Sequence, residues 1–148
     1  MYTTPSYKKG GLPQPLLFLG FFMNTIDLNK DTFQTAIQDS KPMIVDFWAP
    51  WCGPCRSFAP VFEEVAAKHD DVTFAKVNTE EQEELATGMG IRSIPTLMVF
   101  REQVLLFSQP GALTASQLEE LVTQVKAVDM KKVHAEIAEQ QDERGNQA

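Results

Sequence analysis

The sequence predicts an α/β fold in which helices cover both faces of a central β-sheet. Short apolar runs of strand length alternate with helical patterns along most of the chain, which favours a sheet with crossover helices. The run "MIVDFWA" (43–49) is almost wholly apolar, as expected of a strand that is covered on both sides. Two neighbouring strand patterns and an amphipathic helix follow further along. With 148 residues, the chain can form one domain with a hydrophobic core but is short for two.

The expected elements begin after Met23, where the pattern becomes regular. The segment "NTIDL" (24–28) is a candidate for a short strand. Asn29 or Asp31 can cap the helix that follows. The buried face of that helix should contain Phe33, Ala36 and Ile37. The strand at 43–49 comes next.

A longer helix is expected from about Pro54 to His69, directly after that strand. Its apolar residues recur at helical spacing, at Phe58, Phe62 and Val65. Pro54 suits the first turn of a helix, where the N–H that proline lacks would have no partner. Pro60 lies inside the pattern and is expected to kink the helix.

The second half of the chain continues the alternation. "VTFAKVN" (72–78) has the pattern of a strand and "EEQEELATGMG" (80–90) that of a short helix. "TLMVF" (96–100) and "VLLFS" (104–108) are two closely spaced strands. An amphipathic helix from Thr114 to about Val128 should bury Leu118, Leu121, Val122 and Val125.

The two ends differ from this domain, which we place at 23–128. Residues 1–22 combine turn residues with an apolar run that is too short for a bilayer, since a spanning helix needs about 20 residues. Residues 1–22 could be a signal peptide, with Lys8 and Lys9 as its charged region and residues 16–22 as its apolar region, but no small-residue cleavage site follows. We favour Met23 as the true start, with a targeting segment as the alternative. The tail, 129–148, should be helical at first and fray after about Gln140.

Charge and cysteine content exclude several classes of protein. The net charge is −7, and residues 1–22 contain two lysines and no acid, so the remainder carries −9. Such an acidic chain is a poor candidate for a nucleic-acid or anionic-membrane surface. Two cysteines cannot form a disulfide scaffold, and they lack the second ligand pair that a structural zinc requires. We therefore expect no metal.

The cysteine pair Cys52-Gly53-Pro54-Cys55 lies between the strand at 43–49 and the start of a helix. The N–H groups and dipole of a helix start lower the pKa of a thiol there. Cys55 is one helical turn further on, close enough to form a disulfide with Cys52. The pair can therefore attack another protein's disulfide through Cys52 and resolve the mixed disulfide through Cys55. The alternative is two incidental core thiols.

Asp46 is an acid in the apolar strand, and it should share a face with Ile44 and Trp48. Burial raises the pKa of a carboxyl group, so Asp46 can accept the proton of Cys55 when that thiol attacks. Lys76, in the strand at 72–78, is a candidate charge partner. The alternatives are a structural acid with satisfied hydrogen bonds and a lysine that extends to solvent.

At these residues the chain resembles the thioredoxin family. "VDFWAPWCGPC" (45–55), "AKVN" (75–78), "GIRSIPT" (90–96) and "PGAL" (110–113) occur in the family's order and spacing. The likeness covers about 23–128 and implies the thioredoxin fold, with a mixed central sheet. Details such as "APWCGPCR" and "FAPVFEEVA" are more similar to the bacterial thioredoxin 2 type than to thioredoxin 1. The cysteine-rich zinc segment of that type is absent, because residues 1–51 contain no cysteine.

The resemblance implies roles for the matching residues. Cys52 would be the nucleophile, Cys55 the resolving thiol and Asp46 the proton acceptor tuned by Lys76. Pro95 would follow a cis peptide bond and face the cysteines. The substrate would bind in a groove formed by Trp51, Gly53, Pro54, Ile94, Pro95, Gly111 and Ala112. One departure is Glu102-Gln103, where the family usually has a turn that contains glycine.

The resemblance further implies a cytoplasmic protein-disulfide reductase that is a monomer and binds no cofactor. Its electrons would come from NADPH through thioredoxin reductase, and its substrates would be disulfide-bearing proteins. The residues between the cysteines tune the redox potential, and Gly53-Pro54 resembles the reducing members. If residues 1–22 are a signal, a periplasmic reductant or isomerase is expected instead. A third hypothesis is a docking module in which the cysteines are dispensable.

Overall fold

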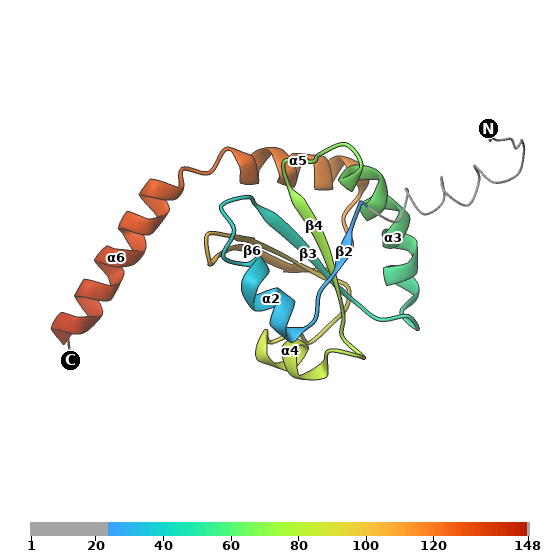
Figure 1. Ribbon diagram of the computed structural model, residues 1–148, viewed down its shortest axis with the longest axis horizontal. Helices are drawn as coiled ribbons and strands as arrows, with labels where there is room; N and C mark the ends of the chain where they lie inside the picture. Colours follow the sequence, from blue (N-terminus) through green and yellow to red (C-terminus); the bar gives the residue numbers. More distant parts are fainter. Residues whose placement is uncertain (1–23, 148) are drawn as a thin grey trace, which may run out of the picture.

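The computed structural model describes residues 24–147 and shows one five-stranded mixed sheet between two layers of helices (Figure 1). The leader proposed at 1–22 lies outside the described residues. The strand order is β2-β4-β3-β5-β6. Strands β2 (Ile26–Asp27), β4 (Thr73–Asn78) and β3 (Met43–Trp48) pair in parallel. Strands β5 (Thr96–Arg101) and β6 (Val104–Pro110) continue the sheet antiparallel to β3. The α/β fold predicted from the sequence is confirmed.

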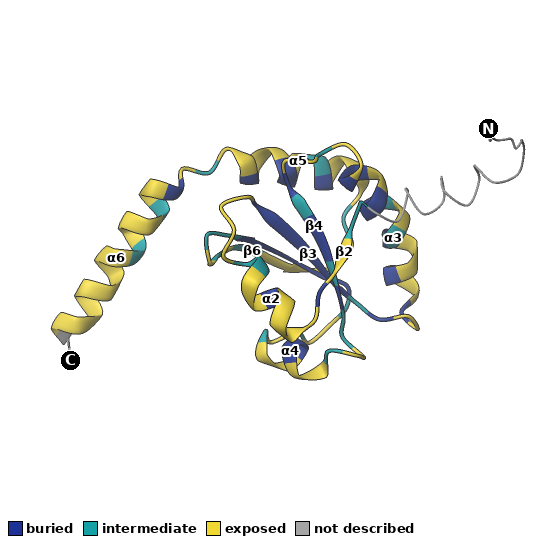
Figure 2. Ribbon diagram, in the orientation of Figure 1, coloured by how far each residue is buried: buried dark blue, intermediate teal, exposed yellow. Residues whose placement is uncertain are grey.

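Each face of the sheet packs against its own pair of helices. Helices α2 (Lys30–Ala36) and α4 (Glu83–Gly88) cover one face, where Phe33 packs on Phe47 and Phe100. Helices α3 (Gly53–Ala66) and α5 (Ala115–Lys126) cover the other, where the core contains Phe58, Phe62, Leu118 and Val122. Because side chains alternate along a strand, the two faces of β3 belong to different cores. Figure 2 shows β3 in dark blue, which means that it is buried, and its residues contribute to both cores.

Local chemistry explains where the helices begin. Asn29 caps α2 and Thr114 caps α5, each in a reciprocal capping box. In both boxes the cap side chain accepts a backbone N–H that has no partner within the helix. The four apolar residues predicted for the buried face of α5 are buried. Helix α3 ends at Ala66, three residues before the predicted boundary, and runs through Pro60.

The β5–β6 hairpin has a two-residue turn without glycine. Glu102 and Gln103 have φ values of 53° and 67°, the left-handed region that side chains usually avoid. Their N–H groups donate to the carbonyl oxygens of Asp39 and Ile37, at 2.9 and 2.7 Å. These two bonds anchor the turn to the segment after α2. The departure from the family's glycine-containing turn therefore leaves a tight hairpin in place.

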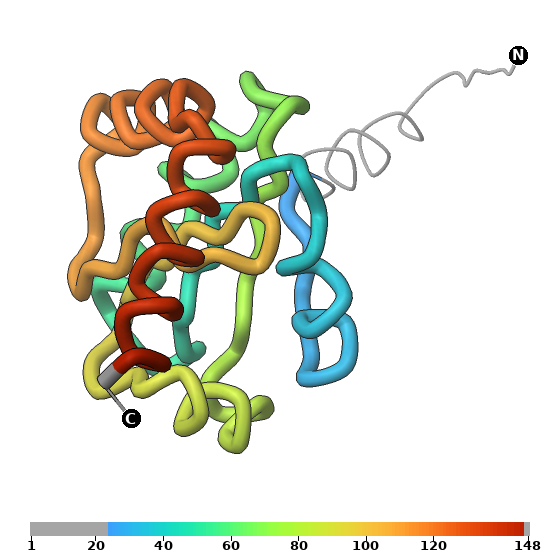
Figure 3. The backbone as a smooth tube through the Cα atoms, turned by 90° about the vertical axis from the view of Figure 1, so that its left-hand side faces the viewer, coloured from blue at the N-terminus to red at the C-terminus, as the bar shows by residue number. Residues whose placement is uncertain are grey.

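The tail forms a helix, α6 (Met130–Gln147), and the prediction that it frays after Gln140 is wrong. The stretch "AEIAEQQDER" (135–144) consists mostly of strong helix formers and has no proline, so the helix continues. Among residues 130–146 of α6, only Met130 is buried, and Val133 and Ile137 are half-buried. The helix leaves the domain after α5 and stands beside it, passing near the β5–β6 hairpin (Figures 1 and 3). No helix within residues 24–147 is long and apolar enough to cross a membrane.

Candidate active site

A disulfide joins Cys52 and Cys55 at the start of α3, just after the loop that follows β3. Cys52 is the N-cap residue of α3 and has extended backbone angles, while Cys55 is already helical. This geometry brings the two Cα atoms to 5.2 Å, within the range that a disulfide requires. The side chains are 5% and 2% exposed, so Cys52 is the more accessible of the two. The pairing predicted from the sequence is confirmed.

The start of α3 supplies a donor to the sulfur of Cys52. The N–H of Cys55 lies 3.2 Å from Cys52 Sγ and donates to it. When the disulfide is reduced, this N–H group and the positive end of the helix dipole favour the thiolate of Cys52 over the thiol. Arg56, next along the helix, donates instead to the carbonyl oxygen of Pro50, at 3.0 Å. Cys52 is therefore the cysteine whose negative charge the fold stabilises.

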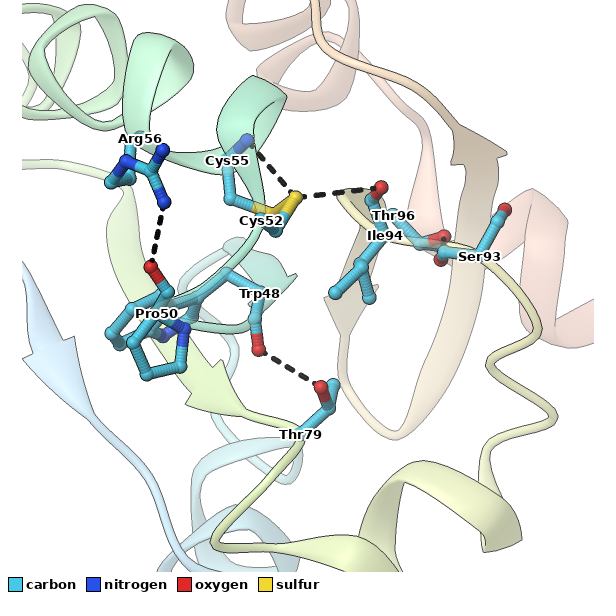
Figure 4. The surroundings of a disulfide bond; sticks show 9 residues. All are labelled: Trp48, Pro50, Cys52, Cys55, Arg56, Thr79, Ser93, Ile94 and Thr96. Atoms are coloured by element: carbon cyan, nitrogen blue, oxygen red, sulfur yellow. Dashed lines mark hydrogen bonds between the residues drawn. A yellow bond between two sulfur atoms is a disulfide. The ribbon is translucent and has the colours of Figure 1, made fainter.

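The loop before β5 faces the disulfide from the side opposite α3 (Figure 4). The peptide bond between Ile94 and Pro95 is cis, as the resemblance implies. The carbonyl oxygen of Ile94 lies 3.8 Å from Cys52 Sγ. Thr96 closes the loop by donating its hydroxyl to the carbonyl oxygen of Ser93, at 2.6 Å. The sequence separates Ile94 from Cys52 by 42 residues, and the fold brings them into contact.

The remaining predicted groove residues lie around this contact. Trp51 is 66% exposed, the most exposed large apolar side chain within the described residues. Gly53 and Pro54 are exposed at the start of α3, and Gly111 and Ala112 are exposed after β6. The N–H of Gly111 donates to the carbonyl oxygen of Pro95, at 2.8 Å, and so joins the two loops. Gly111 has a φ of +102°, which favours glycine at that position.

Asp46 is 1% exposed, and neither of its carboxylate oxygens has a hydrogen-bond partner in the described part of the protein. Burial removes the carboxylate from water and raises the pKa of Asp46 to about 7, although the positive charge of Lys76 acts in the opposite direction. Asp46 alternates with residues that face α2 and α4, so its side chain lies on the face of β3 that α3 covers. Cys55 is buried on α3.

Lys76, the candidate charge partner of Asp46, is its neighbour on the adjacent strand but does not form an ion pair with it. Its ammonium group lies over the ring of Trp48, 4.7 Å from the ring centre. This cation–π contact keeps the amine at the edge of the apolar region. The charge of Lys76 therefore reaches Asp46 through space, without a hydrogen bond.

Sequence reasoning missed Glu63, a second buried acid on this side of the sheet. Glu63 is 5% exposed and its Oε1 accepts a hydrogen bond from Thr25 Oγ1, at 2.6 Å. Its Oε2 has no partner within the described residues. In the sequence, two adjacent glutamates such as Glu63 and Glu64 are typical of the exposed face of a helix. In the structure, the orientation of α3 buries Glu63 and leaves Glu64 exposed.

Comparison with known proteins decides the family. The family model for thioredoxins matches residues 24–141. The chain belongs to the thioredoxin family. A Streptomyces coelicolor protein described as a thioredoxin 2 is 47% identical over 122 residues, 82% of this chain and 91% of that protein. A thioredoxin of Alicyclobacillus acidocaldarius is 55% identical over 78 residues, 52% of this chain and 74% of that protein.

Solved structures of thioredoxins have the same fold. The thioredoxin of Malassezia sympodialis superposes with a TM-score of 0.62 at 35% identity, over 68% of this chain and 89% of that one. The short form of thioredoxin f from spinach chloroplasts gives 0.65 at 31% identity, over 70% and 96%. With the Cys52–Cys55 disulfide in the active-site position, this thioredoxin-family chain is a thiol-disulfide oxidoreductase that reduces protein disulfides. Its partners are disulfide-bearing proteins and a reductase.

Proposed function

We propose that this chain is a reducing, cytoplasmic thioredoxin that acts as a monomer and receives electrons from NADPH through thioredoxin reductase. The observation that carries the proposal is that few groups around Cys52 stabilise a negative charge on its sulfur. Its Sγ accepts one backbone N–H, and within the described residues it contacts no cationic side chain. A strong oxidant stabilises its reduced form, as DsbA does. A thiolate with a single N–H donor and a buried acid nearby favours a low reduction potential instead.

The reaction follows from the order of exposure of the two sulfurs. The thiolate of Cys52 attacks one sulfur of the substrate disulfide, whose S–S bond breaks and releases the first substrate thiol. The second sulfur remains bound to Cys52 as a mixed disulfide. Cys55 then loses its proton and attacks Cys52 Sγ, which releases the second thiol and forms the Cys52–Cys55 disulfide. Two electrons pass from the two cysteines to the substrate without a bound cofactor. Because Cys52 attacks as a thiolate, Cys55 gives up one proton and solvent supplies the other to the substrate thiols.

Asp46 accepts the proton of Cys55 in this scheme. A carboxylate with an ordinary pKa would be a weak base at neutral pH, whereas burial brings the pKa of Asp46 to about 7. Lys76 tunes this acceptor through its charge. The groove for the substrate is formed by Trp51, Ile94, Pro95, Gly111 and Ala112, which surround Cys52 at the surface; main-chain contact there would allow many disulfides to bind.

The test is the redox equilibrium of the Cys52–Cys55 pair against glutathione, followed by the fluorescence of Trp48 and Trp51. A potential clearly below that of the glutathione pool supports a cytoplasmic reductant. A potential well above it supports an oxidant or isomerase, and the periplasm would then be the expected compartment. Mass spectrometry of the native N-terminus separates the two independently, since a start at Met23 excludes a cleaved signal in residues 1–22.

A further inference from the structure

A pocket of about 370 Å³ opens on the α3 side of the sheet, beside the candidate active site. Its lining includes Thr25, Asp27, Trp48, Glu63 and Lys76. Two of these residues are acids and one is a base, in a pocket whose exposed lining is mostly apolar. The proposed reaction uses neither acid. Because Asp27 and Glu63 line the same pocket as Lys76, their charges can attract its ammonium group.

Lys76 lies between two acids in the register of the sheet. Asp27 on β2 pairs with Lys76 on β4, and Lys76 pairs in turn with Asp46 on β3. Asp27 is exposed and Asp46 is buried, so Lys76 separates a solvated carboxylate from a desolvated one. Glu63 reaches the same pocket from α3. Lys76 therefore shares the pocket with Asp27 and Glu63 and has Asp46 as its neighbour on the other adjacent strand.

The ammonium group is held by none of these three acids. Within residues 24–147, the ammonium group of Lys76 has no ion pair or hydrogen bond, and it lies over the ring of Trp48. The unpartnered buried side-chain oxygens of the described residues belong to Asp46 and Glu63. Opposite charges attract over distances beyond hydrogen-bond contact, so the position of Lys76 depends on the balance among these acids.

That balance matters for Asp46. An ammonium group that moved into contact with Asp46 would stabilise its charged form and leave it a weak base at neutral pH. Acids on the pocket side attract the ammonium group in the other direction.

We propose that Asp27 and Glu63 are positioning residues whose negative charges draw the Lys76 ammonium group toward the pocket and away from Asp46, so that Asp46 stays available to accept a proton. The proposal rests on the role of Asp46 proposed above. The charged group that acts on Asp46 is Lys76 from β4, with Asp27 beyond it on β2. Helix α3, which covers this face of β3, carries the buried residues Cys55 and Glu63. On β5 its register partner is Leu97, which carries no charge.

The direct test is a carbon-13 NMR titration of the Asp46 carboxyl group in the full-length oxidised chain, in which Cys52 and Cys55 do not titrate. The variants are Asp27→Asn, Glu63→Gln and the pair; glutamine at 63 keeps an acceptor for Thr25. In the double variant we expect the midpoint of the Asp46 titration to move to lower pH. The proton concentration at the midpoint should rise about threefold or more. Glu64→Gln is the matched control, because Glu64 has the same charge on the same helix but is exposed. It should leave the titration unchanged. An unchanged titration in the double variant would overturn the proposal.

A second measurement asks whether the acids act through Lys76. The two substitutions are repeated in a Lys76→Met background, where we expect them to have less than half of their effect. An equal effect in that background would show direct charge repulsion alone and would contradict a positioning role. The ε-CH₂ protons of Lys76 provide a structural readout, since the Trp48 ring shifts their resonance upfield and the shift should diminish in the double variant.

Failure of this proposal is distinguishable from failure of the proposed reaction. If Asp46→Asn slows disulfide reduction while Asp27→Asn and Glu63→Gln do not move the Asp46 titration, Asp46 retains its role and the positioning residues lose theirs. If the titration moves as expected but Asp46→Asn leaves the pH profile of reduction intact, the positioning is correct and the role of Asp46 in the reaction is wrong.

Discussion

Asp46 is a residue whose burial costs the protein stability. Its pKa is about 7 in the folded protein and its ordinary value is 3.8. Below pH 3.8 the carboxyl group is neutral in both the folded and the unfolded chain, so it carries no penalty. As the pH rises from 3.8 to 7, Asp46 loses its proton in the unfolded chain but keeps it in the folded protein, so unfolding becomes more favourable. Above pH 7 the penalty is complete.

Asp46→Asn should therefore stabilise the protein at alkaline pH and have little effect at acid pH. The difference between the two pKa values sets an upper limit of about 4 kcal/mol. We expect the free energy of unfolding at pH 8 to rise by about 1–4 kcal/mol. Urea unfolding of the oxidised protein between pH 4 and pH 8 measures this, with Asp31→Asn on the exposed surface of α2 as control. A constant difference across the pH range would contradict a raised pKa.

The same substitution should slow the chemistry. Without a proton acceptor for Cys55, the mixed disulfide should persist, and its resolution at pH 7.5 should be at least about tenfold slower. Rapid quenching with acid followed by mass spectrometry measures the lifetime of the mixed disulfide. The first attack, by Cys52, should be affected much less. Equal slowing of both steps would indicate a general disturbance of the site.

At the residue scale, the sequence identified the functional residues that stand out from their neighbours along the chain. Cys52 and Cys55 are three apart at the end of an apolar strand, and Asp46 interrupts that strand. Glu63 was not identified, because the apolar stripe of Phe58, Phe62 and Val65 marks the buried face of α3 but does not show that the packing on the sheet also covers the acid beside it. The contact of Ile94 with Cys52 came from the family resemblance, since their separation in the chain leaves no local pattern.

At the scale of single elements, the β5–β6 turn shows how a hydrogen-bonded anchor offsets an unfavourable backbone conformation. Gln103 has a left-handed backbone, yet its N–H donates to Ile37 and the hairpin is tight. The sequence could not show this anchor, because the carbonyl groups that accept the two bonds lie in the segment after α2. Element types were otherwise predicted correctly, while boundaries shifted where caps and tertiary packing decide them. The strand expected at 24–28 has only two paired residues.

Gln103→Gly should stabilise the domain, since glycine adopts a positive φ without steric cost and keeps the N–H. We expect a gain of about 0.5–1 kcal/mol in the free energy of unfolding. Gln124→Gly is the matched control, because it makes the same exchange in the exposed part of helix α5 and should cost about 1 kcal/mol. Chemical denaturation of the two variants beside the unaltered protein measures both effects. A loss of stability in Gln103→Gly would mean that the side chain itself supports the turn.

At the scale of the whole molecule, α6 is attached to the domain by few contacts. Met130 is buried, Val133 and Ile137 are half-buried, and His134 lies 2.9 Å from Glu102 in the hairpin turn. An exposed pair of this kind contributes little to stability. The sequence predicted a helical start here, but neither the length of the helix nor its direction, which depend on a linker of three residues between α5 and α6.

Removal of residues 131–148 should therefore leave the domain intact. We expect the rate of disulfide reduction to stay within about twofold and the free energy of unfolding to fall by less than about 1 kcal/mol. A turbidity assay of insulin reduction and thermal unfolding test the two expectations. Loss of reduction would show that the tail takes part in the site. Loss of a cellular role with unchanged reduction would favour the docking hypothesis for the tail alone.

The sheet also divides the molecule into compartments of different chemistry. The core beneath α2 and α4 is built largely of apolar residues, among them Phe33, Phe47 and Phe100, and none of the described residues buried in it is charged. The opposite side contains the buried acids Asp46 and Glu63. The first compartment can thus be redesigned for heat tolerance, or can drift during evolution, while the electron chemistry on the other side keeps its potential and its pH response.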